Sequence, residues 1–166
     1  RDELVRVARL AVRIAKASAA LNKEKIELAA EPAWKDFWQT PLQIDPFKVS
    51  LEDKLATLYG CDEILRKSKE IKAAECSMSF LREHQYYASS EGAVIEQILT
   101  RSGAGYTVTA EKNGEVQVRS YPMSHGGQSM SLGYELINSM DLIGNAERVR
   151  EEAIALLSAP QCPTGK

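Results

Sequence analysis

Histidine and cysteine are scarce in this chain, which limits the metal chemistry open to it. The two histidines, His84 and His125, lie 41 residues apart, whereas a catalytic zinc site usually takes two histidines four residues apart on a helix. The three cysteines, Cys61, Cys76 and Cys162, are odd in number and widely spaced, which fits neither a disulfide framework nor a zinc finger. We therefore expect no metal or cofactor site within this segment and a reducing, cytoplasmic location.

Long apolar runs and an excess of one charge are also missing. No stretch approaches the roughly 18 consecutive apolar residues that span a bilayer, and the first residues are charged rather than apolar as in a signal peptide. The 21 Lys and Arg against 23 Asp and Glu leave a net charge of -2, so no basic field exists to hold a nucleic-acid backbone. These features argue against a membrane partner and a nucleic-acid partner.

The composition is otherwise that of an ordinary globular domain. The 166 residues are 44% hydrophobic and 27% charged, which suffices for one hydrophobic core. We expect residues 1–166 to form a single α+β domain. Because the chain begins at Arg1 rather than Met, we interpret it as a fragment of a longer protein.

Apolar periodicity predicts three helices, at residues 2–21, 50–69 and 145–157. The first has a basic stripe opposite its apolar one, which is either a solvated face or a docking surface for an acidic partner. Ser50 followed by Asp53 is a helix-capping signal for the second. Residues 22–47 contain three prolines and are predicted to be irregular.

Alternation with a period of two predicts about five strands between residues 74 and 121. They are expected at 74–80, 85–89, 93–100, 106–110 and 116–121. Cys76 falls on the apolar side of the first, which favours a core position. Asn113-Gly114 predicts a two-residue hairpin turn, and every connection is too short for a parallel crossover. The sequence thus predicts an α+β fold, an antiparallel β-meander of about five strands flanked by about three helices.

Two short motifs have a superficial likeness to catalytic sequences. Ser124-His125-Gly126-Gly127 is similar to loops that form an oxyanion hole, but the nearby Gly127–Ser131 lacks the final glycine of a nucleophile elbow. Gly103-Ala104-Gly105 lacks the third glycine of a dinucleotide fingerprint. We assign no catalytic residue and no metal ligand to this segment.

Several longer sequence motifs are distinctive in their order and spacing. They are Trp38-Gln39-Thr40-Pro41, Ile44-Asp45-Pro46-Phe47, Ser89-Ser90-Glu91-Gly92, Val116-Gln117-Val118-Arg119-Ser120-Tyr121-Pro122 and Asp141-Leu142-Ile143-Gly144-Asn145-Ala146-Glu147-Arg148-Val149. Together they resemble the TldD/PmbA family, and its TldD branch in particular. The resemblance covers nearly the whole chain, from Asp2 to Gly165.

The resemblance implies a cytoplasmic metallopeptidase that matures peptide precursors or degrades unfolded peptides. Members of TldD type bind zinc through a His-Glu-x-x-x-His helix and a later cysteine, and pair with a TldD/PmbA-type partner subunit as a homo- or heterodimer. This sequence has no His-Glu-x-x-x-His, and Cys162 precedes the position of the family's zinc cysteine. Zinc is therefore expected in the parent chain, in the C-terminal half that this segment lacks.

Two interpretations follow from this resemblance. In the first, the segment is a non-catalytic N-terminal or middle portion of a zinc-dependent metallopeptidase and shapes the path of an unstructured peptide and subunit assembly. In the second, it is a binding or heterodimerisation module of a family member with no hydrolytic role. As substrate-binding or interface residues we select Glu91 and Gly92 at a sheet turn and Arg119 and Tyr121 at the end of the last strand; alternatively, these four residues only stabilise the sheet.

Overall fold

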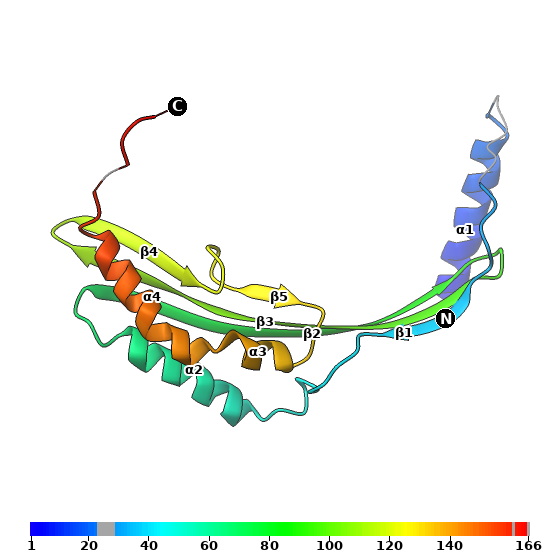
Figure 1. Ribbon diagram of the computed structural model, residues 1–166. Helices are drawn as coiled ribbons and strands as arrows, with labels where there is room; N and C mark the ends of the chain where they lie inside the picture. The colour runs from blue at the N-terminus through cyan, green and yellow to red at the C-terminus, as the bar shows by residue number, and fades with distance from the viewer. Residues whose placement is uncertain (23–28, 161, 166) are drawn as a thin grey trace. The chain divides into compact units, whose positions relative to one another are not determined.

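The computed structural model describes residues 1–22, 29–160 and 162–165. The chain divides into two compact units, Arg1–Pro32 and Ala33–Lys166. Helices and a five-stranded sheet make up the second unit, which confirms the α+β class (Figure 1). None of the helices in the described ranges is long and apolar enough to cross a membrane.

The first unit contains one helix, α1, at Asp2–Ala19. This confirms the predicted helix to within two residues at its C-terminal end. All of its side chains are exposed, including Leu4 and Ile14 of the apolar stripe, and Arg6 forms an ion pair with Glu3 one turn away. Residues 23–28, part of the segment predicted to be irregular, lie outside the described residues.

The second unit is organised around one long hairpin. β2 (Ile71–Ala88) and β3 (Val94–Lys112) pair antiparallel in a continuous register from Ala73 opposite Thr109 to Ala88 opposite Val94. The prediction of four short strands here was wrong. The main chain stays extended through Gly103–Gly105 because β3 has hydrogen-bonded neighbours on both of its edges, which overrides the weak strand propensity of glycine.

Three strands share the other edge of β3. β1 (Lys35–Gln39) pairs with its beginning, β5 (Gln128–Met130) with its middle and β4 (Glu115–Tyr121) with its end. β1 runs parallel to β3, so the sheet is mixed and the predicted meander is antiparallel only in part. The parallel pairing is possible because α2 and β2 together form a crossover between β1 and β3 that is long enough. β1 lies in the segment predicted to be irregular, and β5 lies outside the predicted strands.

Two features of this region agree with the sequence. The predicted hairpin turn between β3 and β4 is confirmed, with positive φ angles of 55° at Asn113 and 86° at Gly114. The predicted helix cap is confirmed as well, because the Ser50 side chain accepts from the Asp53 N–H at 3.0 Å. These signals were reliable because they depend on residues adjacent in the chain.

All three helices of the second unit lie on one face of the sheet (Figure 1). They are α2 (Leu51–Leu65), α3 (Glu135–Met140) and α4 (Leu142–Leu156). α3 was not predicted, and α4 begins three residues earlier than expected. The reason is Asp141, which has a left-handed φ of 46°, separates the two helices and accepts from the Gly144 N–H at 3.2 Å.

The core lies between these helices and the middle of the sheet. Tyr106 and Val108 of β3 are buried against Cys61 of α2 and Val149 of α4. Small residues at the contacts, such as Ala146, let α4 approach the sheet closely. Cys76 packs against this core from β2, as predicted.

A carboxylate joins the segment before α2 to the start of α3. Glu135 accepts hydrogen bonds from the N–H groups of Ile44 at 2.9 Å, Gly133 at 2.8 Å and Gln43 at 3.3 Å. Partial burial alone would raise the pKa of Glu135, but the hydrogen bonds from Gly133 and Ile44 outweigh it and hold the pKa below its ordinary value. A side chain on Gly133 would lie 2.2 Å from the Ile44 carbonyl oxygen, so glycine is required there.

We predict that Glu135→Gln lowers the free energy of unfolding by about 1–3 kcal/mol at pH 7, because the amide loses the charge that the three N–H groups stabilise. Since the folded pKa is depressed, this contribution is present above pH 4.5, the ordinary pKa of glutamate, and disappears as the pH falls through the folded pKa. Urea unfolding of both proteins between pH 7 and pH 3 measures it. Glu63→Gln, on the exposed side of α2, is the control. A difference between wild type and Glu135→Gln that is the same at both ends of this range would contradict the assignment.

Candidate functional site

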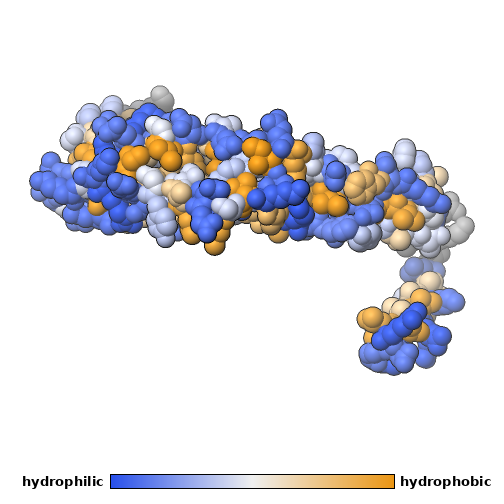
Figure 2. Space-filling model, turned by 90° about the horizontal axis from the view of Figure 1, so that it is seen from below, coloured by the Kyte–Doolittle hydropathy of each residue, from blue (hydrophilic) through white to orange (hydrophobic). Residues whose placement is uncertain are grey.

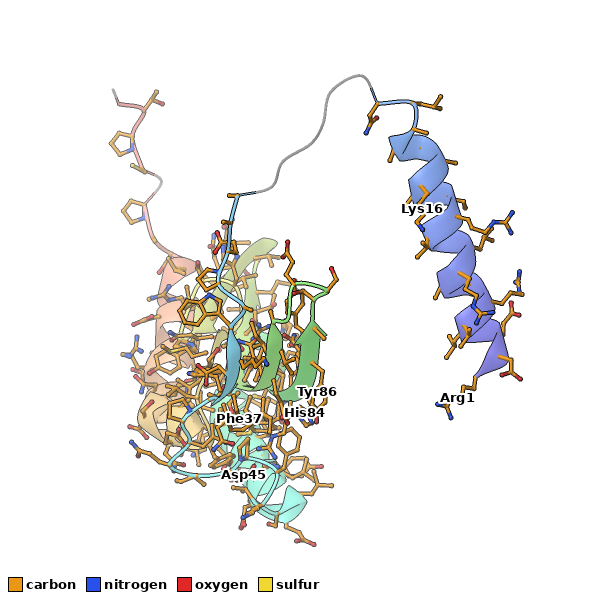
Figure 3. All side chains as sticks on the ribbon, turned by 90° about the vertical axis from the view of Figure 1, so that its right-hand side faces the viewer. Arg1, Lys16, Phe37, Asp45, His84 and Tyr86 are labelled. Atoms are coloured by element: carbon orange, nitrogen blue, oxygen red, sulfur yellow. The ribbon has the colours of Figure 1, made fainter. Side chains whose placement is uncertain are left out.

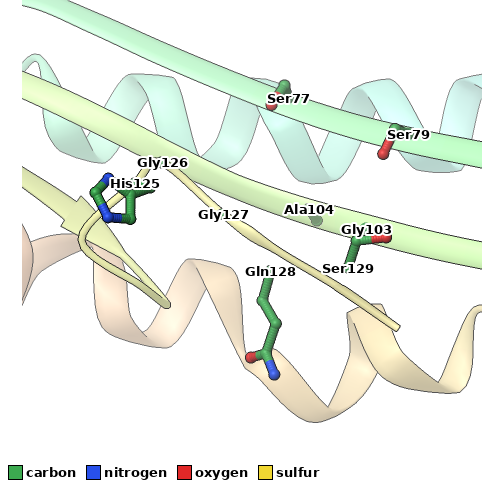
Figure 4. Close-up of a pocket in the computed structure, with 9 residues that line it drawn as sticks. All are labelled: Ser77, Ser79, Gly103, Ala104, His125, Gly126, Gly127, Gln128 and Ser129. Atoms are coloured by element: carbon green, nitrogen blue, oxygen red, sulfur yellow. The ribbon is translucent and has the colours of Figure 1, made fainter. Parts of the chain in front are cut away.

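The face of the sheet opposite the helices carries a small polar cleft of about 260 Å³. Alternate residues of β2 and β3 reach this face, because their neighbours point into the core. Figure 4 shows the lining residues, which come from β2, β3, β5 and the segment that leads into β5. They are Ser77, Ser79, Gly103, Ala104, His125, Gly126, Gly127, Gln128 and Ser129.

The cleft forms because the loop that follows β4 packs closely against Gly105 of β3. A Cβ atom on Gly105 would lie 2.3 Å from Cα of Gly127 and 2.4 Å from the carbonyl oxygen of Gly126. A Cβ atom on Gly127 would in turn lie 2.9 Å from the Ala104 carbonyl oxygen. Only hydrogen at both positions allows the two backbones to approach this closely.

The groups that line the cleft are suited to hydrogen bonding with a ligand. Its lining supplies the hydroxyl groups of three serines, the Gln128 carboxamide, main-chain groups and one titratable side chain, His125. Ser129 already donates to the Ser102 carbonyl at 3.2 Å. No carboxylate or thiol is among the described residues that line it, so His125 has no acid to orient it as the base of a serine nucleophile.

The outer edge of β2 lies beside this cleft. The Ser89 N–H donates to the Ala93 carbonyl, so the odd-numbered residues of β2 direct their main-chain groups to β3, and the even-numbered residues direct theirs outward. The Ala74 carbonyl accepts from Arg66 of α2 at 2.7 Å. From Cys76 to Ala88, no hydrogen bond within the described ranges reaches the outward groups. The edge is therefore open to an additional strand.

The described part of the chain does not suit a zinc ion. It contains no group of three or more His, Cys, Asp or Glu side chains that could hold a metal. Burial raises the pKa of Cys61 to about 11 and that of Cys76 to about 12, so neither supplies a thiolate near neutral pH. His84 is hydrogen-bonded to Glu96 at 2.6 Å, a pair that gives at most two ligands.

Sequence comparison identifies the family. The model of the PmbA/TldA metallopeptidase central domain matches residues 44–157, more than half of the chain. The chain belongs to the PmbA/TldD family. It is also similar to Metalloprotease MJ0996 of Methanocaldococcus jannaschii, with 27% identity over 165 residues, 99% of this chain and 35% of that protein. The chain thus spans about a third of the length of this relative, and the family resemblance seen in the sequence is confirmed.

The four residues selected from the sequence of this PmbA/TldD family member fall into two distant pairs. Glu91 and Gly92 are in the turn between β2 and β3, where Gly92 has a φ of 99° that favours glycine. Arg119 and Tyr121 are on β4, opposite Val108 and Tyr106. At about 3.3 Å per residue, the two pairs are roughly 45 Å apart along β3. The structure does not bring them together.

Arg119 and Tyr121 both face α4 and have intramolecular partners. Arg119 forms an ion pair with Glu152 at 2.7 Å. The Tyr121 hydroxyl donates to the Met140 carbonyl at 2.7 Å, and its ring stacks on Tyr106 with centroids 5.7 Å apart. These contacts join β4 to the helices. A role near a substrate or interface remains a prediction for all four residues.

Sequence reasoning missed the serines of the cleft in this central domain. Ser77 and Ser79 were recognised only as the polar side of a strand. The available signal was their position as alternating small residues in the strand that precedes the glycine-rich Gly103–Gly105. Strands with small residues on one face let another backbone approach closely, but the register that puts Ser79 opposite Gly103 is a property of the folded hairpin.

We predict that Gly105→Ala destabilises the protein by about 2–4 kcal/mol, because the new methyl group overlaps backbone that has no room to move. Thermal unfolding followed by circular dichroism measures the effect. Gly60→Ala is the matched control: its methyl group meets only the flexible end of Ile143, at 3.3 Å, and alanine favours the helix that contains it. Equal stability of Gly105→Ala and wild type would show that the loop does not rest on β3.

Proposed function

We propose that this chain is a non-catalytic part of a zinc-dependent metallopeptidase that cleaves or matures unstructured peptides. In this proposal it shapes the substrate path and takes part in pairing with a TldD/PmbA-type subunit. Family membership and the metalloprotease relative support a protease-related domain. The observation that carries the proposal further is the polar cleft lying directly beside the unpaired edge of β2.

An extended peptide fits this edge by addition of a strand. Cys76, Met78 and Phe80 present outward N–H and C=O groups at the spacing of a β-ladder. The intervening Ser77 and Ser79 direct their hydroxyl groups to the cleft. The stretch Cys76–Leu81 carries no charged side chain, so pairing there depends on the peptide main chain rather than on its sequence. An unstructured peptide is the suitable ligand because a folded protein has already paired its own backbone groups.

The zinc ligands belong, in this proposal, to the part of the parent protein outside this segment. Membership of a metallopeptidase family supports zinc in the parent protein. We also propose a cytoplasmic location, which three unpaired cysteines support. Glu91 and Gly92 at the exposed hairpin turn remain candidates for substrate-binding or interface residues, as do Arg119 and Tyr121 on β4.

We expect the full-length parent protein to contain zinc by mass spectrometry and to cleave an unfolded peptide. We expect the 166-residue segment to do neither. Zinc and cleavage in the isolated segment would contradict the assignment of the chemistry to the rest of the chain. A parent protein with neither zinc nor cleavage would instead support a pairing module without hydrolytic activity.

The peptide path makes a further prediction for the full-length enzyme. Ser79→Trp places a large side chain over the cleft, and we expect it to raise KM about tenfold with kcat unchanged, because binding of ground state and transition state is weakened equally. Val118→Trp is the control, since Val118 is 55% exposed on the same face of the sheet and outside the cleft. An unchanged KM for Ser79→Trp, or an equal rise for Val118→Trp, would refute the proposed path.

A further inference from the structure

A second cleft, of about 450 Å³, lies on the face of the sheet that bears the helices. Arg82 of β2 lines it, on the same side of the strand as Phe80, which packs against the core. Figure 2 views this face, on which hydrophobic and hydrophilic residues lie side by side. Asp45, also in the lining, lies below the strands in Figure 3, on the side of the helices. The volume is within the range of about 300–1,000 Å³ that is typical of small-molecule sites.

Three neighbours hold Arg82 in one orientation. Its Nε donates to Oγ1 of Thr100 at 3.0 Å, and its Nη2 donates to Oδ1 of Asp45 at 2.8 Å. The guanidinium carbon lies 4.6 Å from the centre of the Phe47 ring. Because the guanidinium group is already fixed, little conformational freedom is lost when a ligand binds to it.

One hydrogen-bonding atom of each charged partner is unused. In the described part of the chain, no group accepts a hydrogen bond from Nη1 of Arg82, and none donates to Oδ2 of Asp45. The Phe47 N–H and Arg82 hold the pKa of Asp45 below its ordinary value, so this carboxylate is charged at neutral pH. The cleft therefore offers a positive and a negative group side by side.

Two buried threonines add hydroxyl groups to the lining. Thr40 is 4% exposed and Thr100 is 1% exposed. Oγ1 of Thr40 accepts from the Thr100 N–H at 3.0 Å, and Oγ1 of Thr100 accepts from Arg82. Neither hydroxyl donates to another group within residues 1–22, 29–160 and 162–165. A buried hydroxyl proton without an acceptor is unfavourable, and an oxygen atom of a ligand supplies that acceptor.

The rest of the lining is mostly apolar. Pro41 and Leu42 follow β1, and Ile98 lies on β3. Leu42 and Ile98 are half-buried, so an aliphatic group placed against them loses contact with water. The cleft thus combines a cation, an anion, hydroxyl donors and an apolar wall. These are the groups that recognise the carboxylate, the ammonium group and the side chain of an α-amino acid.

The charge of the cleft argues against other small ligands. Asp45 neutralises Arg82, and no other cationic side chain of the described residues lines the cleft. A phosphate group would therefore meet no excess positive charge. A divalent metal ion would meet one carboxylate with a guanidinium group beside it. A zwitterion, by contrast, pairs with both charged groups and leaves the net charge unchanged.

We propose that this cleft binds a free α-amino acid with an aliphatic side chain. Arg82 and the threonine hydroxyls bind its carboxylate, Asp45 binds its ammonium group, and Ile98 contacts its side chain. Since the Arg82 and Asp45 groups share a hydrogen bond, one small molecule reaches both, whereas the terminal charges of a peptide are at least one residue farther apart. Complete cleavage of peptides releases such ligands, but the site is formed by this chain alone and does not depend on the proposed peptidase role.

Calorimetric titration of L-leucine into the full-length protein tests the site. Zinc in the parent protein can itself bind an amino acid, so the titration is repeated after a chelator has removed metal. We expect a Kd on the order of 1 mM, unchanged by the chelator. N-acetyl-L-leucine lacks the ammonium charge and L-leucinol lacks the carboxylate. We expect each to bind the metal-free protein at least about tenfold more weakly.

Variants of the full-length protein test the assigned residues. We expect Arg82→Gln and Asp45→Asn each to raise the Kd for L-leucine about tenfold or more. Ile98→Trp fills the apolar part of the cleft without changing a charge, and we expect a similar rise. Arg101→Gln is the matched control, because Arg101 is exposed on the opposite face of β3 from Thr100. Circular dichroism of each variant confirms that it is folded.

Several results would overturn the amino-acid site. They are the absence of binding at ten times the expected Kd, binding that disappears with the metal, and binding that the folded Arg82→Gln, Asp45→Asn and Ile98→Trp variants retain. Equal weakening by Arg101→Gln would also overturn it. Tighter binding of L-leucyl-L-leucine than of L-leucine would assign the cleft to a peptide end instead. A parent protein that binds L-leucine in this way but has neither zinc nor cleavage would refute the peptidase role alone.

Discussion

The antiparallel pairing of β2 with β3 is the interaction on which the rest of the second unit depends. It gives β3 one complete neighbour along nearly its whole length and leaves the other edge to be shared by β1, β5 and β4. The pairing also fixes which side chains face the helices, since a shift of one residue would exchange the two faces. Tyr106 and Val108 reach the core, and Gly103 and Gly105 the opposite face, because of this register.

A hairpin of this length is longer than the helices that cover it. α2, α3 and α4 stabilise one half by burying apolar residues such as Leu65 and Val149. The other half depends on the sheet hydrogen bonds and on a few contacts near the boundary, among them the Arg82–Asp45 ion pair at 2.8 Å. This division accounts for a single sheet that has a dry core at one end and exposed aromatic residues at the other.

Two residues, Gly105 and Glu135, hold segments without regular secondary structure against the rest of the fold. Gly105 accepts the chain after β4, and Glu135 fastens the segment before α2 to α3. In the sequence, Gly105 belongs to Gly103-Ala104-Gly105, which has only a superficial likeness to a dinucleotide fingerprint, and no local pattern predicts the contacts of Glu135. The physical reason for these residues is a close approach between segments far apart in the chain, such as Ile44 and Gly133, and such an approach leaves no local pattern.

The sequence by itself determined the α+β class, the first helix, the Ser50 cap, the Asn113-Gly114 turn and the family. Each of these depends on residues that are neighbours in the chain or on short sequence motifs in a fixed order. It also placed Cys76 at the core through simple alternation. The tertiary structure decided that β2 and β3 are continuous, that β1 is parallel, and that the serines of β2 meet the loop at Gly126 in one cleft. It also put Arg119 against α4 and Tyr121 against the end of α3, far from Glu91 and Gly92. These features depend on which strand edges pair and on how closely distant backbones approach, and those are settled only when the whole sheet forms.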